Sequence, residues 1–146
     1  MIKVTVSMLQ LNGWVAVLIG SFILLDPVAV IDPYGIQANL SAGLMSELRA
    51  PGGLLIASGL MIVHCSLNAE LFALGLQHSI MVYGGYGSAR LVGFVLDGQP
   101  PSEILLATGI ELVLFGISLM LLQMHRQAFQ PAITGQLSKF SLFRRQ

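Results

Sequence analysis

The chain has 146 residues, of which 55% are hydrophobic and only 10% are charged, and its formal net charge is zero. A soluble domain carries about 25% charged residues, so this composition excludes an ordinary soluble protein. The balanced charge leaves no basic surface for nucleic acid. The single cysteine, Cys65, cannot form a disulfide within the chain, so the redox compartment stays open.

Four apolar stretches explain the low charge. They cover residues 4–25, 47–66, 70–96 and 103–124. Each is near or above the ~20 residues that a helix needs to cross a ~30 Å hydrocarbon core. The first stretch is too long for the apolar part of a signal peptide, and Asp26-Pro27 follows it where small residues would mark a cleavage site. We therefore expect an all-α integral membrane protein, a four-helix bundle formed by residues 1–126.

Charges flanking the four stretches predict the orientation in the membrane. Basic residues lie near the two ends of the chain: Lys3, Arg126, Lys139, Arg144 and Arg145. Acidic residues occupy the first and third connections: Asp26, Asp32, Asp97 and Glu103. Because Lys and Arg near helix ends mark the cytoplasmic side, we expect both termini in the cytoplasm and these two connections outside.

The connections and the tail carry their own signals. Turn residues in the first connection, residues 26–46, leave room for a short interfacial helix over 36–45. Pro100 and Pro101 stiffen the third connection, and Ser102 is the expected N-cap of the fourth helix. Residues 127–146 combine basic and aromatic residues, a composition typical of an amphipathic segment on the membrane surface; a disordered tail is the alternative.

Four charged residues lie inside or at the rim of the apolar stretches: Glu47, Arg49, Arg90 and Glu111. A charge in hydrocarbon costs several kcal/mol, so such residues are usually paired. At ~1.5 Å per residue, Arg90 and Glu111 lie about 9 and 12 Å below the outer surface. This similar depth predicts an ion pair between the third and fourth helices. We expect Arg49 to reach Asp97 or Glu111, and Glu47 to reach Arg90.

Helical spacing extends this set into one cluster. Tyr83, Tyr86, Arg90 and Asp97 share a stripe of the third helix. The predicted polar cluster therefore comprises Glu47, Arg49, Tyr83, Tyr86, Arg90, Asp97 and Glu111. Three roles are open: holding the helices in register, binding a polar head group or small anion, and catalysis or proton relay. We assign no catalytic residue, and whether the protein is an enzyme stays uncertain, with a non-enzyme favoured.

Histidines and glycines support more limited predictions. His64 and His78 lie at different depths in the second and third stretches, which argues against axial haem ligation, and no carboxylate or cysteine completes a metal set. We therefore predict no metal and no cofactor, although a quinone or lipid remains an option. The glycine spacing predicts close packing of the helices, and Asn12 is expected to make an interhelical hydrogen bond.

Three motifs carry a resemblance to a known family. They are Ser46-Glu47-Leu48-Arg49-Ala50-Pro51-Gly52-Gly53, then Gly87-Ser88-Ala89-Arg90-Leu91-Val92 with Asp97-Gly98-Gln99-Pro100, and Glu111-Leu112. Together they resemble the motifs of the domain-of-unknown-function 4345 family of small bacterial membrane proteins, over roughly residues 8–124. The resemblance implies a four-helix protein of the bacterial inner membrane, similar in general architecture to DoxX-type proteins. It implies no agreed activity.

The leading functional hypothesis from the sequence is a non-catalytic accessory or structural subunit. It would pack against a larger membrane complex, respiratory or photosynthetic, with the lipid bilayer as its other partner. The alternative is a membrane module that binds a quinone, a lipid head group or a carboxylate through the charged cluster, with a role in redox chemistry or transport.

Overall fold

The computed structural model describes the backbone of residues 2–31 and 41–143, and the side chains up to residue 127. Within these ranges the chain is all-helical, with no strand. The elements are α1 (Ile2–Leu25), α2 (Pro27–Ile31), α3 (Ala42–Cys65), the short 3-10 helix η2 (Ala69–Leu71), α4 (Phe72–Asp97) and α5 (Ser102–Phe143).

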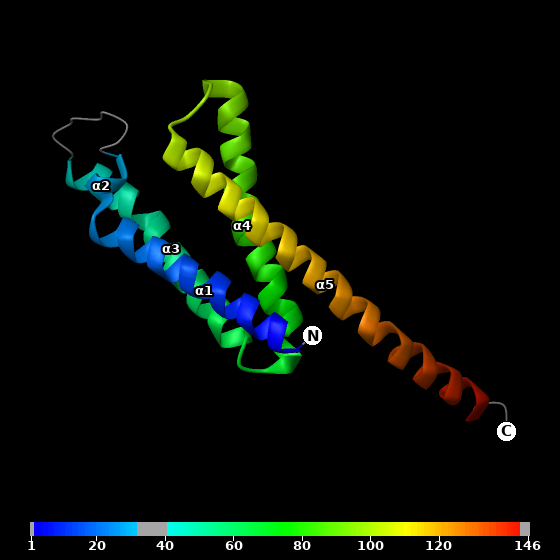
Figure 1. Cartoon of the computed structure of the whole chain (residues 1–146). Coiled ribbons are helices and arrows are strands. Elements are labelled where there is room, and N and C mark those ends of the chain that lie inside the picture. The colour runs from blue at the N-terminus through cyan, green and yellow to red at the C-terminus, as the bar shows by residue number, and fades with distance from the viewer. Residues whose placement is uncertain (1, 32–40, 144–146) are drawn as a thin grey trace.

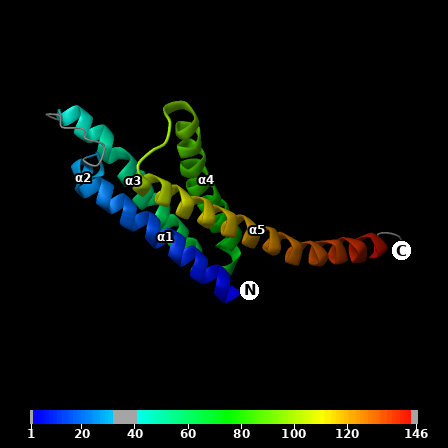
Figure 2. The same ribbon diagram turned by 45° about the horizontal axis from the view of Figure 1, so that its top comes forward.

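The long helices form two antiparallel pairs (Figures 1 and 2). α1 packs along α3, and α4 packs along α5, while α4 also contacts α1 and α3. The N-terminal end of α1 and the turn between α3 and α4 lie at one end of the molecule, and α2 and the turn between α4 and α5 lie at the other. α4 is therefore the helix that joins the two pairs.

Three of these helices are long and apolar enough to cross a membrane: α1, α3 and residues 102–127 of α5. Large apolar side chains point outward from the helices, and Val95 and Leu106 are 84% and 68% exposed. Such a surface suits lipid rather than water. The predicted span over 70–96 forms α4, which has 26 residues but is not among the three, because histidine, arginine, serine and several glycines dilute its apolar residues.

Two glycine pairs hold α1 against α3. A Cβ on Gly13 would lie 2.7 Å from the carbonyl oxygen of Gly59, and one on Gly59 would lie 2.5 Å from that of Gly13. Gly20 and Gly52 repeat this relation at 2.6 and 2.7 Å. Such distances mean that the two backbones touch, which is how membrane helices gain close packing. The close packing predicted from the glycine spacing is confirmed here.

Capping residues explain most helix boundaries. Asp26 accepts a hydrogen bond from the backbone N–H of Ala29 at 3.1 Å and starts α2, with Pro27 in its first position. Ser41 caps α3 in the same way through Leu44. α3 thus begins five residues before the predicted boundary at 47, because hydropathy marks where the apolar stretch starts rather than where the helix starts. Half of the predicted interfacial helix over 36–45 lies outside the described residues, and the described half, from the N-cap Ser41 onward, belongs to α3.

The turn between α4 and α5 differs slightly from prediction. Gly98 has a φ of 93°, a left-handed conformation that glycine adopts without strain and that ends α4. Ser102 was the expected N-cap, but it is the first helical residue, and the carbonyl of Pro101 accepts from Ile104 and Leu105 instead.

α5 continues well beyond the predicted end of the fourth span at 124, as one helix of 42 residues. At 1.5 Å per residue it is ~63 Å long, about twice the thickness of the hydrocarbon core. Its C-terminal part projects away from the other helices (Figure 1).

Replacing Gly59 with alanine tests the backbone contact between α1 and α3. The new Cβ meets backbone atoms that cannot move aside, so we expect a loss of unfolding free energy of about 1–3 kcal/mol, measured by reversible SDS titration in mild detergent. Gly53→Ala on the same helix is the matched control, because a Cβ there meets nothing within 4 Å. Equal stability of the two variants would contradict the contact.

Candidate functional site: a cavity between the two helix pairs

An ion pair joins α4 to α5. The Nε of Arg90 donates to Oε2 of Glu111 at 3.1 Å and to Oε1 at 3.3 Å. The side chains are 28% and 13% exposed, so the pair is partly rather than fully buried. The predicted contact between these two residues is thus present, and Glu111 rather than Glu47 is the partner of Arg90.

Glycines on α4 allow this close approach. A Cβ on Gly87, one turn before Arg90, would lie 3.0 Å from the side chain of Leu112 and 3.8 Å from the Cβ of Glu111. One turn earlier, a Cβ on Gly84 would lie 2.8 Å from the ring of Phe115. The side chains of α5 therefore pack directly onto the α4 backbone, which brings Glu111 within reach of the guanidinium.

The ion pair lines a cavity of about 260 Å³. Its four polar or charged wall residues are Tyr83, Tyr86, Arg90 and Glu111. The rest of the wall is apolar and comes from all four long helices: Val15, Ala16, Ile19, Ile23, Leu55, Val82, Ala107 and Ile110. A mostly apolar cavity with a few convergent polar groups is the usual form of a small-molecule site.

The charges of Arg90 and Glu111 balance at the cavity wall, but Arg90 has further hydrogen-bond donors. Arg90 contacts Glu111 through Nε, and among the described residues no acceptor bonds to its Nη1 and Nη2 groups. A guanidinium offers five N–H donors in a planar fork. Because the carboxylate of Glu111 neutralises the charge, the remaining donors suit a neutral oxygen acceptor better than a further anion.

Tyr83 lines the cavity and is held by a hydrogen bond to α1. It is 4% exposed, and its hydroxyl donates to the backbone carbonyl of Asn12 on α1. The Asn12 side chain donates to the Ser118 hydroxyl on α5 at 2.8 Å, and Ser118 donates to the carbonyl of Leu114. These bonds tie three helices together, and they confirm the interhelical hydrogen bond predicted for Asn12.

Three members of the predicted cluster lie elsewhere. Arg49 donates through Nη1 to the carbonyls of Leu24 and, at 3.4 Å, Leu25, at the C-terminal end of α1. The prediction that it reaches Asp97 or Glu111 is wrong, because the close packing of α1 on α3 places it over unsatisfied carbonyls and the negative end of a helix dipole. Glu47 and Asp97 are exposed and do not line the cavity.

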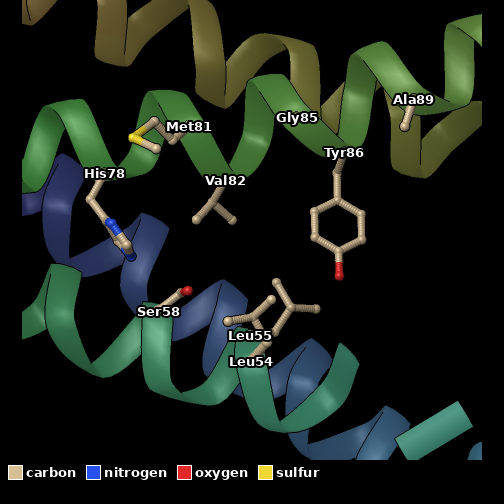
Figure 3. A pocket seen from close by; sticks show the side chains of 9 residues that line it. All are labelled: Leu54, Leu55, Ser58, His78, Met81, Val82, Gly85, Tyr86 and Ala89. Carbon is tan, nitrogen blue, oxygen red and sulfur yellow. The ribbon is translucent and has the colours of Figure 1, made fainter. Parts of the chain in front are cut away.

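An open groove of about 410 Å³ between α3 and α4 was not predicted. It is lined by Leu54, Leu55, Ser58, His78, Met81, Val82, Gly85, Tyr86 and Ala89. His78, Val82 and Tyr86 point from α4 toward α3 (Figure 3). Their spacing of four residues indicates a shared helix face, and this spacing is the signal in the sequence that points to the groove.

Comparison with known proteins gives one result. A family model described as "Domain of unknown function (DUF4345)" matches residues 5–122. No curated protein and no solved structure matches the chain.

A double-mutant cycle tests the ion pair. Arg90→Met and Glu111→Leu should each destabilise the protein, because each leaves an uncompensated charge. The double variant should lose less than the two single losses combined, with a coupling energy of ~0.5–3 kcal/mol by SDS titration. As a control, Arg49→Met combined with Glu111→Leu should be additive, because Arg49 binds α1 carbonyls. Additive losses for Arg90 and Glu111 would show that the pair is uncoupled.

Proposed function

Because the chain belongs to the DUF4345 family, whose description assigns no activity, we propose its function from its geometry. The protein is a membrane-spanning module that binds a small, neutral, oxygen-bearing molecule of the bilayer in the cavity beside Arg90 and Glu111. One observation carries this proposal: the cavity wall holds a guanidinium whose charge is neutralised but whose terminal donors have no described acceptor.

The membrane setting that we propose has four spans, with both termini in the cytoplasm. α4 is the fourth span, since its 26 residues extend ~39 Å. Its polar side chains are tolerable in hydrocarbon because α1, α3 and α5 all contact it. The basic residues near the chain ends support the orientation, and the inner membrane of bacteria is the compartment that fits the family resemblance.

The depth of Arg90 along α4 favours a ligand that is dissolved in the membrane. Arg90 lies seven residues before the end of α4 at Asp97, which is ~10 Å along the helix. A head group bound at this depth would lose its contacts with water and gain contacts with the guanidinium donors and with the rings of Tyr83 and Tyr86. The proposal includes no chemical step on the ligand.

Native purification tests this binding role. The protein is extracted with its surrounding lipid in polymer-bounded discs, and bound neutral lipids and pigments are quantified by mass spectrometry. We expect one neutral amphiphile to be enriched over bulk lipid, and Ala107→Leu, which adds three carbons to the cavity wall, to lower that enrichment at least tenfold. Arg49→Gln is the control outside the cavity. Unchanged enrichment in Ala107→Leu would contradict the proposal.

A second candidate is the accessory subunit, favoured by the outer face of α5. Gly109 and Gly116 lie two turns apart on one face of this helix, and a Cβ on either would meet nothing within 4 Å. Small residues that no internal neighbour covers leave room for a helix of another protein. A respiratory or photosynthetic complex is the assembly proposed for it.

Mild-detergent purification tests the accessory role. A stable partner should co-purify with the wild-type chain, and Gly116→Leu should release it while the chain itself stays folded. A wild-type chain that purifies alone and monodisperse would exclude the second candidate without affecting the first.

A further inference from the structure

We propose that the groove between α3 and α4 holds the hydrocarbon tail of the ligand, and that the cavity holds its flat, carbonyl-bearing ring. The ligand class is therefore that of tailed membrane quinones. This inference rests on the proposed binding function and deepens it, because it assigns separate parts of the ligand to the two hollows.

The cavity and the groove adjoin each other along shared side chains. Leu55, Val82 and Tyr86 line both of them. The cavity alone, at about 260 Å³, is smaller than the ~300–1,000 Å³ typical of ligand pockets, whereas the groove adds about 410 Å³. We therefore place the part of the ligand beyond the ring past Tyr86, in the groove.

The two parts differ in chemistry as the two parts of such a ligand do. The cavity holds all the charge, on Arg90 and Glu111. The groove lining is mostly apolar and contains no charged residue among those described, and its polar members are Ser58, His78 and Tyr86. The groove between α3 and α4 opens to the outside of the protein, where Met81 is 74% exposed. A tail lying in the groove would therefore remain in contact with the surrounding lipid.

A quinone ring matches the cavity in three respects. Its carbonyl oxygens accept hydrogen bonds, which the Nη groups of Arg90 can donate because no acceptor among the described residues uses them. It is uncharged, and the Arg90–Glu111 pair is neutral. It is flat, and the aromatic ring of Tyr86 borders the space and offers a stacking surface.

The groove favours tailed ligands by giving the tail space, and not through the hydrophobic effect. Lipid tails are as apolar as the groove lining, so moving a tail from bilayer to groove gains little free energy. The groove instead lets the tail leave the cavity without a clash. Blocking it should therefore exclude tailed ligands and leave a tail-free ring unaffected.

Gly85 provides the variant that separates these effects. It lines the groove but not the cavity, and a Cβ there meets nothing within 4 Å, so Gly85→Leu adds a side chain to the groove from a position with an unobstructed Cβ. Gly116→Leu is the matched control, since its position on α5 is equally open and lines neither space.

The probes are 2,3-dimethoxy-5-methyl-1,4-benzoquinone with and without a decyl chain. Each is titrated into full-length protein in detergent micelles, with all tyrosines replaced by 3-fluorotyrosine. Binding is followed by the ¹⁹F resonance of Tyr86, assigned with Tyr86→Phe. We expect both probes to shift this resonance in the wild type and in Gly116→Leu. In Gly85→Leu, the midpoint for the decyl probe should rise at least tenfold, while the midpoint for the tail-free probe stays within twofold of wild type.

The outcomes distinguish a failure of the groove assignment from a failure of the proposed function. An unchanged decyl titration in Gly85→Leu, with both probes still binding, overturns the groove assignment and leaves the proposed function intact. Failure of both probes to shift the Tyr86 resonance in the wild type overturns the quinone assignment. In that case, enrichment of some other neutral lipid in the native extraction would still support the binding function, and its absence would end both.

Discussion

Backbone contact between α1 and α3 is the constraint on which the other features depend. In a bilayer the hydrophobic effect does not drive helices together, so association relies on close packing. The pairs Gly13–Gly59 and Gly20–Gly52 bring the two backbones together at two points of a shared face, two helical turns apart. The close packing of α1 on α3 also fixes the position of Arg49, whose guanidinium donates to the last carbonyls of α1.

α4 is close to the α1–α3 pair at its N-terminal end and separated from it at its C-terminal end. Near its start, a Cβ on Gly75 would lie 2.7 Å from Cys65, whereas Gly85 further along has nothing within 4 Å. α4 diverges from α1 and α3 toward the turn that leads to α5 (Figure 1). The cavity and the groove lie along the stretch of α4 from His78 to Arg90, and Tyr83 bonds to α1 within this stretch.

The sequence predicted much of this arrangement where local chemistry decides it. Apolar length located the long helices, helical spacing and depth paired Arg90 with Glu111, and polarity in an apolar helix predicted the hydrogen bond of Asn12. It failed where the answer depends on how helices cross. Arg49 was assigned to the wrong partner because its position follows from the glycine contacts, and the groove was missed because it exists only where α3 and α4 separate. The end of α5 was missed because a helix continues past its apolar stretch.

α4 shows why low hydropathy and a cavity with an ion pair in its wall occur together in this fold. An arginine, a histidine and two tyrosines in one helix raise the cost of placing it in hydrocarbon. The contacts with α1, α3 and α5 lower that cost by shielding the polar side chains and pairing Arg90 with Glu111. A pair of apolar side chains would hold α4 against α5 without any desolvation cost. The ion pair differs from such a replacement, because its charge is balanced while the Nη groups of Arg90 keep donors that no described residue accepts.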